Sequence, residues 1–120
     1  MSENKSAYLI KQRAFLKVFL LAEIEKGQSY GLQLKKIIQQ KFDEYGFKPD
    51  HSEIYRSLHE LMKDGYLSKT EELVKGAEFK TVEVYRIKDK DKVKAYKELV
   101  KPDLDRSRDL IRRAIEEIYS

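Results

Sequence analysis

The stretch that decides the fold is residues 49–67, PDHSEIYRSLHELMKDGYL. Asp50 is a good helix N-cap, and Gly65 suits the left-handed turn at a helix end. Apolar residues recur between them at helical spacing and form one face: Ile54, Leu58, Leu61 and Met62. The opposite face is polar: Ser52, Arg56, His59, Glu60 and Lys63. The stretch is therefore predicted to form a capped amphipathic helix over residues 50–64 that runs into a strand.

Two more helices are predicted before this one. The first covers residues 7–24, with a broad apolar face made by Leu9, Ile10, Phe15, Leu16, Phe19, Leu20 and Ile24. The second covers residues 30–45, with Ser29 as a possible cap, Gly46 as its stop, and a buried side expected from Leu32, Leu34, Ile37, Ile38, Phe42 and Tyr45. A connector of only a few residues separates it from the helix at 50–64, as in a helix-turn-helix.

A β-hairpin is predicted after the third helix. Tyr66 and Leu67 open one strand, and residues 79–87 (FKTVEVYRI) are β-branched and aromatic with alternation, which is typical of a second strand. Lys75 and Gly76 form the turn between them. Lysines make the tip of this hairpin basic: Lys69, Lys75 and Lys80.

The last segment, residues 89–120, is predicted to be one long helix. Its apolar residues recur at spacings of three, four and seven: Val93, Tyr96, Val100, Leu104, Ile111, Ile115 and Ile118. About 30 residues would span about 45 Å, more than so small a body can cover. We therefore expect this seam to pair with the same helix of a second copy. Pro102 is expected to kink the helix or break it briefly.

A short polar-fronted helix followed by a basic hairpin is how winged-helix proteins present a helix to the DNA major groove. The chain is therefore predicted to be an α+β winged helix-turn-helix with a long C-terminal dimerisation helix. It is one structural domain, with a DNA-binding body at residues 1–88 and a dimerisation helix at residues 89–120.

Composition limits the partners and the location. The 120 residues are 41% apolar and 38% charged, with a net charge of +4, which favours a polyanionic partner only weakly. The sequence has no cysteine and no apolar run long enough for a membrane span, and its start lacks a secretory signal. We expect a cytoplasmic, nucleoid-associated protein without a membrane partner.

No catalytic or metal-binding pattern is present in the sequence. His51 and His59 are eight residues apart, whereas a metal-binding pair on a helix is three or four apart. There is no glycine-rich phosphate loop and no nucleophile elbow. We expect no enzymatic activity, no metal and no cofactor.

The helix at residues 50–64 carries the candidate DNA-reading residues. Arg56 is the strongest candidate, because arginine can donate two hydrogen bonds to guanine. Ser52 and Glu53 lie near the helix start, where base edges are usually met; Glu53 either accepts from cytosine or closes a capping box. Lys63 suits a phosphate contact. Tyr55 is either a packed ring with an exposed hydroxyl or a DNA contact. The alternative for the whole face is a solvated charged surface.

Further basic residues flank this helix. Lys11, Arg13 and Lys17 on the first helix, and Lys69, Lys75 and Lys80 on the hairpin, are placed to contact backbone phosphates. Such contacts add salt-dependent affinity without reading sequence. The alternative for any single lysine is solubility alone.

Several blocks of the sequence resemble the bacterial replication termination protein family. They are residues 11–17 (KQRAFLK), 30–32 (YGL), 46–49 (GFKP), 53–61 (EIYRSLHEL), 76–77 (GA) and 104–106 (LDR). The resemblance covers nearly the whole chain. It implies a symmetric winged-helix dimer that binds terminator sites in double-stranded DNA and arrests the replication fork in one direction.

The resemblance also implies roles for segments and residues. Residues 50–64 would read the major groove, residues 68–81 would contact the adjacent groove, and residues 89–118 would pair with their mate as an antiparallel coiled coil. The family's basic residues on the first helix correspond to Lys11 and Arg13, and its helicase-contacting tyrosine to Tyr30. The chain departs from the family at Gly27, where the family has an acidic residue, and at Pro102, where it has an aliphatic one.

Two other functions fit the same residues. A PadR-like transcriptional regulator would share the YGLQL stretch at residues 30–34, the DGYL at residues 64–67 and a dimerising last helix. A winged-helix protein-interaction module with little DNA binding would suit the nearly even charge balance.

Overall fold

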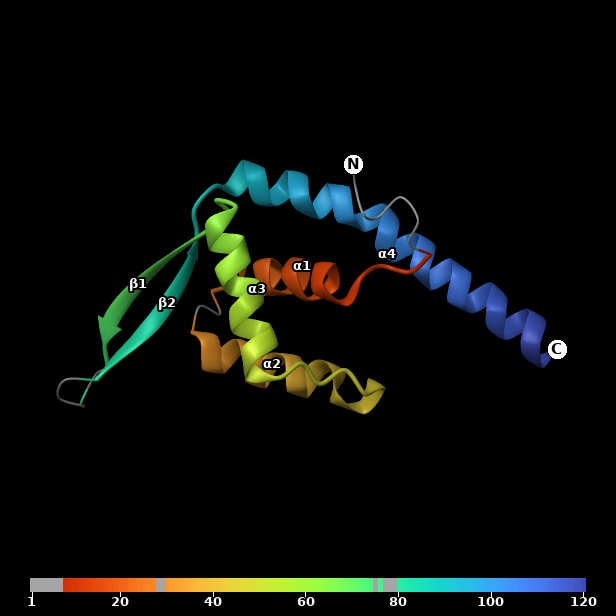
Figure 1. Ribbon diagram of the computed structural model, residues 1–120, viewed down its shortest axis with the longest axis horizontal. Helices are drawn as coiled ribbons and strands as arrows, with labels where there is room; N and C mark the ends of the chain where they lie inside the picture. Colours follow the sequence, from red (N-terminus) through yellow and green to blue (C-terminus); the bar gives the residue numbers. More distant parts are fainter. Residues whose placement is uncertain (1–7, 28–29, 75, 77–79) are drawn as a thin grey trace.

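The computed structural model describes residues 8–27, 30–74, 76 and 80–120. Its elements are α1 (Gln12–Glu25), α2 (Gly31–Phe42), a short 3₁₀ turn η2 (Asp43–Tyr45), α3 (His51–Lys63), β1 (Leu67–Leu73), β2 (Thr81–Ile87) and α4 (Lys90–Tyr119). The molecule measures 61 × 32 × 22 Å. The hairpin projects from one end of the helical body and the C-terminal half of α4 from the other (Figure 1).

One apolar core joins the helices to the base of the hairpin. Its fully buried side chains come from every helix and from both strands: Leu16, Leu20, Leu21, Leu34, Ile38, Ile54, Leu58, Leu61, Leu67, Tyr85 and Val93. Phe15 and Phe42 meet edge to face, with ring centroids 5.5 Å apart, and Phe47 packs on Phe15 at 5.2 Å. The connector between α2 and α3 is thereby fixed against α1, which sets the helix-turn-helix geometry.

The structure confirms the predicted limits of α3. The Asp50 side chain accepts a hydrogen bond of 2.8 Å from the backbone N–H of Glu53, so the N-cap is formed. Ile54, Leu58 and Leu61 are buried, and Gly65 adopts the left-handed conformation with φ +86°.

The first helix begins later than predicted. Lys11 is extended and serves as the N-cap of α1, whereas the apolar spacing suggested a start at residue 7. The backbone N–H of Ile10 donates a hydrogen bond of 2.7 Å to Ser107 Oγ on α4, which holds this segment against α4 outside the helix. Leu9 is exposed, so the prediction that it belongs to the apolar face of α1 is wrong.

The second helix differs from the prediction at both ends. Tyr30 is its N-cap, whereas the predicted cap, Ser29, lies outside the described residues. Leu32 and Tyr45, both predicted to be buried, are 62% and 75% exposed. Leu32 falls off the buried face set by Leu34 and Ile38, and Tyr45 lies in the 3₁₀ turn, where helical spacing no longer applies.

The hairpin is antiparallel, with its register running from the Leu67↔Ile87 pair to the Leu73↔Thr81 pair. Tyr30 forms an isolated antiparallel bridge to Val84, so the start of α2 adjoins the outer edge of β2. The predicted second strand begins at residue 79, which lies outside the described residues, and the described strand begins at Thr81.

The last helix is continuous and contains Pro102, so the predicted short break is absent in α4; Figure 1 shows one helix that bends along its length. Val93 and Val100 are 0% and 5% exposed within the single chain. The prediction that these two residues form a seam with a second copy is therefore wrong, since they pack into the core of their own chain. None of the helices in the described part of the chain has the length and apolar character of a membrane span.

Candidate nucleic-acid interface

The outward face of α3 carries a stripe of exposed polar side chains. Ser52, Arg56, His59 and Lys63 follow one another at four, three and four residues, which places them on one side of the helix. Within the described part of the chain, the side chains of Arg56 and Lys63 have neither a hydrogen bond nor an ion pair. Two unneutralised cations therefore lie on the exposed face of α3.

Tyr55 and Glu53 lie at the edges of this stripe. The ring of Tyr55 is half-buried, stacks on His51 with centroids 4.2 Å apart, and packs beside Gly31 of α2. Burial raises the pKa of the Tyr55 hydroxyl, and the nearby Glu83 carboxylate adds to this effect. Glu53 is half-buried, and its carbonyl accepts a 2.9 Å hydrogen bond from Ser57.

Arg13 and Lys17 of α1 both reach α3. Arg13 Nη1 lies 2.7 Å from Glu60 Oε2, and Lys17 Nζ lies 2.7 Å from Glu60 Oε1. The hydrogen bond from Lys17, together with that from Arg13, holds the pKa of Glu60 below its usual range. Lys11 is exposed at the N-terminus of the same helix. The structure thus brings the predicted α1 cations next to the predicted reading helix.

The hairpin is less basic than its lysines suggested. Lys69 is neutralised by Glu83 across the strands, at 2.8 Å. Lys80 is exposed and has no ion pair among the described residues, whereas Lys75 lies outside them. Arg86 was not among the predicted residues; it pairs with Glu72 at 2.8 Å and donates to Thr70 at 3.2 Å. Neither pair joins residues directly opposite in the register, since Lys69 faces Tyr85 and Arg86 faces Ser68, so the strand sequences alone did not predict them.

Tyr30 lies where α2 meets the hairpin. Its side chain is partly exposed beside a cavity of about 240 Å³ that is also lined by Leu32, Tyr55 and Val82. Leu73 on β1 is exposed and lines an adjoining cavity with Tyr30. Gly27, at the end of α1, has φ +101° and presents no side chain. The surface around Tyr30 is thus mostly apolar, with Thr81 and Glu83 also lining the first cavity.

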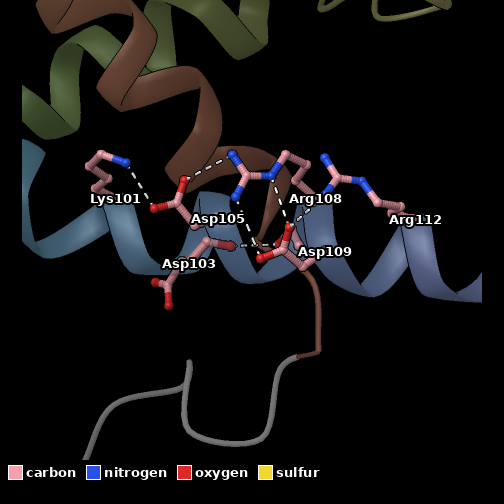
Figure 2. Close-up of polar contacts among 7 residues, drawn as sticks. Lys101, Asp103, Asp105, Arg108, Asp109 and Arg112 are labelled. Atoms are coloured by element: carbon pink, nitrogen blue, oxygen red, sulfur yellow. Dashed lines mark hydrogen bonds and ion pairs between the residues drawn. The ribbon is translucent and has the colours of Figure 1, made fainter.

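The C-terminal half of α4, which projects beyond the helical body, has an apolar stripe flanked by charged residues. Leu104 is half-buried and Tyr96 packs on Tyr66 with ring centroids 5.1 Å apart, whereas Ile111, Ile115 and Ile118 are exposed. Along one flank, ion pairs within the helix link Lys101, Asp105, Arg108, Asp109 and Arg112 (Figure 2). Pairs of this kind stabilise a solvent-exposed helix modestly and leave the apolar stripe unobstructed.

The replication terminator protein family model matches residues 7–119. The chain belongs to the replication terminator protein family. The replication termination proteins of Bacillus subtilis (strain 168) and Bacillus spizizenii are each 42% identical to it over 122 residues, covering 99% of this chain and all of the relative.

Solved structures resemble this family member in fold. A putative transcriptional regulator of Thermoplasma acidophilum matches with a TM-score of 0.70 and 20% identity, covering 87% of this chain and 93% of that one. A transcriptional regulator of Clostridium thermocellum matches with a TM-score of 0.63 and 25% identity, covering 90% and 96%. The predicted winged-helix fold, with its hairpin and long C-terminal helix, is confirmed.

Proposed function

We propose that this protein is a homodimer that binds specific sites in double-stranded DNA and arrests the replication fork there. The observation that carries the proposal is the exposed stripe of α3, in which Arg56 and Lys63 have no ion pair among the described residues. Unpaired cations on a presented helix attract phosphate and leave donors for base edges.

Each part of the surface has a proposed role. Arg56 donates to guanine in the major groove, with Ser52 and Glu53 near the base edges and Tyr55 at the margin of the contact. Lys63 contacts a phosphate. The flanking cations contact the DNA backbone on either side: Lys11, Arg13, Lys17, Lys69, Lys75 and Lys80.

The exposed end of α4 supports the dimer. The face that the body covers at Val93 and Val100 continues beyond the body as Ile111, Ile115 and Ile118, all exposed. Covering apolar side chains contributes about 25 cal/mol per Å², and the same stripe on a second copy, in antiparallel orientation, is the simplest cover. Two reading helices related by a two-fold axis would then meet two half-sites.

Fork arrest is proposed from the relatives and from Tyr30. The Bacillus relatives at 42% identity bear the name replication termination protein. The apolar surface around Tyr30 suits contact with another protein, for which the replicative helicase is the proposed partner. Gly27 has no carboxylate, and the acidic residue that lines this surface is Glu83. Binding to chromosomal DNA would place the protein at the nucleoid, in the cytoplasm.

The test is selection of DNA from a random library with the full-length chain, followed by a fork-arrest assay on the enriched duplex. The proposal predicts an enriched site that stops a helicase-driven fork in one orientation. Enrichment of no duplex would contradict DNA binding and favour a protein-interaction module.

A transcriptional regulator is the second candidate. The regulators of Thermoplasma acidophilum and Clostridium thermocellum share the fold over most of this chain. An enriched palindromic site that allows forks to pass in both orientations would favour this candidate over the terminator.

A further inference from the structure

Glu60 is an acidic residue at the centre of a basic region. It lies four residues after Arg56 and three before Lys63, on the side of α3 that faces α1. Its two carboxylate oxygens are each occupied by a different cation of α1, Arg13 and Lys17, both at 2.7 Å. An acid here reduces the positive charge of the surface, so its presence needs a physical reason.

The reason lies in the donors of Arg13. A guanidinium has five N–H donors in a rigid plane, and the contact with Glu60 uses only Nη1. Nε and Nη2 donate to no described residue, and the side chain is about one-third exposed. A carboxylate that fixes one nitrogen of a planar group also fixes the direction of the others. Arg13 is therefore held beside α3 with donors to spare.

Lys17 has a different part in the contact. Its side chain is only 17% exposed, half the exposure of Arg13, and its ammonium is directed at Glu60 Oε1. Without the carboxylate, Arg13 and Lys17 would repel each other one turn apart on α1. Glu60 therefore allows two cations to lie together, of which Arg13 is the better exposed.

We propose that Glu60 is a positioning residue of the DNA interface, which holds Arg13 so that its free guanidinium donors meet a phosphate of the strand flanking the groove. This inference rests on the proposed DNA-binding function. It has an unusual consequence: removing this negative charge weakens binding to the specific site, although it makes the surface more basic.

The test compares two duplexes and two variants. The wild-type protein first selects its preferred duplex from a random library, and a scrambled duplex of equal length and composition serves as the non-specific probe. For Glu60→Gln we expect affinity for the selected duplex to fall about tenfold, as for loss of one charge-assisted hydrogen bond. Affinity for the scrambled duplex stays equal or rises, because non-specific binding depends on net charge, which is higher, whereas a guanidinium held in one place meets its phosphate only in the fixed register of the specific complex.

A matched control separates position from charge. Glu98 on α4 is exposed and has no ion pair among the described residues. Glu98→Gln makes the same change in net charge, and we expect it to leave the ratio of the two affinities unchanged. A purely structural effect of Glu60→Gln would instead lower both affinities together, which would overturn the proposal.

A second variant keeps the charge. Arg13→Lys retains the ion pair with Glu60 but removes the planar array of donors, so affinity for the selected duplex falls while affinity for the scrambled duplex does not. If the ratio of the affinities for the selected and scrambled duplexes were unchanged in Arg13→Lys, or in a folded Glu60→Gln, the proposed role of Glu60 would be overturned. The proposed DNA-binding function would still stand. A wild-type protein that prefers no duplex would overturn the proposed function itself.

Discussion

Gly31 in the first turn of α2 lies directly against the ring of Tyr55 on α3. A Cβ built on Gly31 would overlap the Tyr55 hydroxyl oxygen and lie 2.6 Å from Cζ of the ring. The residue is helical, so no unusual backbone angle requires a glycine here. The requirement is steric: α2 and α3 approach closely enough only if this position has no side chain.

Gly31→Ala is therefore expected to destabilise the fold by about 1–3 kcal/mol, as overpacking does. The same change in a Tyr55→Leu background should cost nothing or stabilise slightly, because alanine is the better helix former. Urea unfolding of the four proteins of this double-mutant cycle measures the coupling. Equal effects of Gly31→Ala in both backgrounds would show that the ring does not impose the glycine.

Arg56→Ala should weaken binding to the selected duplex by about 1–3 kcal/mol without changing the melting temperature, since the side chain is exposed and has no ion pair among the described residues. Lys94→Ala, an exposed cation on α4, is the matched control. Fluorescence anisotropy with the selected and scrambled duplexes measures the loss. Unchanged affinity would mean that α3 is not the reading helix.

Lys80→Ala should lower affinity for every duplex alike and reduce the slope of log affinity against log salt by about one unit. Lys80 suits this test because its side chain is unpaired within the described structure, and its backbone carbonyl still accepts the bond from Val74 in the variant. Titrations at several salt concentrations give the slope. Loss of affinity for one sequence only would mean that the hairpin reads bases.

Glu23 should make the free energy of unfolding depend on pH in the acid range. It is 3% exposed on α1; burial raises its pKa, but hydrogen bonds from Lys26 and Lys41 outweigh burial and leave the pKa lowered. Because the pKa of Glu23 is lower in the folded state, its ion pairs stabilise the fold fully at pH values above its unfolded pKa of about 4.3. This stabilisation is lost as the pH falls through the folded pKa.

Glu23→Gln should therefore cost about 1–2 kcal/mol near neutral pH, and the difference from wild type should vanish in strong acid. Urea unfolding across the acid range measures this, with the exposed Glu44→Gln as control. A difference that is constant with pH would exclude the ion pairs as its source.

Ile115→Asp should convert the proposed dimer to a monomer at micromolar concentration, because it places a charge in the exposed apolar stripe of α4. Leu99 is also exposed on α4 but lies about 120° away from that stripe around the helix, so Leu99→Asp should leave the dimer intact. Sedimentation velocity distinguishes the two states. A monomeric wild-type protein would refute the role of the stripe.

Local sequence signals predicted α3 well. Its cap at Asp50, its buried residues and its stop at Gly65 depend on neighbours within one helix, and the structure has all of them. The same signals could not separate the two halves of the α4 stripe. Val93 and Ile118 share one helical face, and only the place where the body ends decides which is core and which is exposed.

The candidate nucleic-acid interface also combines features that one helix determines with features that depend on packing between helices. Spacing predicted that Arg56 and Lys63 face solvent, as they do. The binding of Arg13 and Lys17 to Glu60 depends on how α1 crosses α3, and no periodicity within either helix contains that information. The close approach of Gly31 to Tyr55 is likewise a contact between helices.

Methylation interference on the selected duplex tests whether α3 reads the major groove, since it reports contacts to guanine N7 there. We expect interference in two symmetric half-sites, with centres about 10 base pairs or a multiple of this apart. We also expect Arg56→Ala to lose sensitivity at one guanine in each half-site. Binding that is indifferent to methylation at every guanine, in wild type and variant alike, would contradict reading of the major groove by α3.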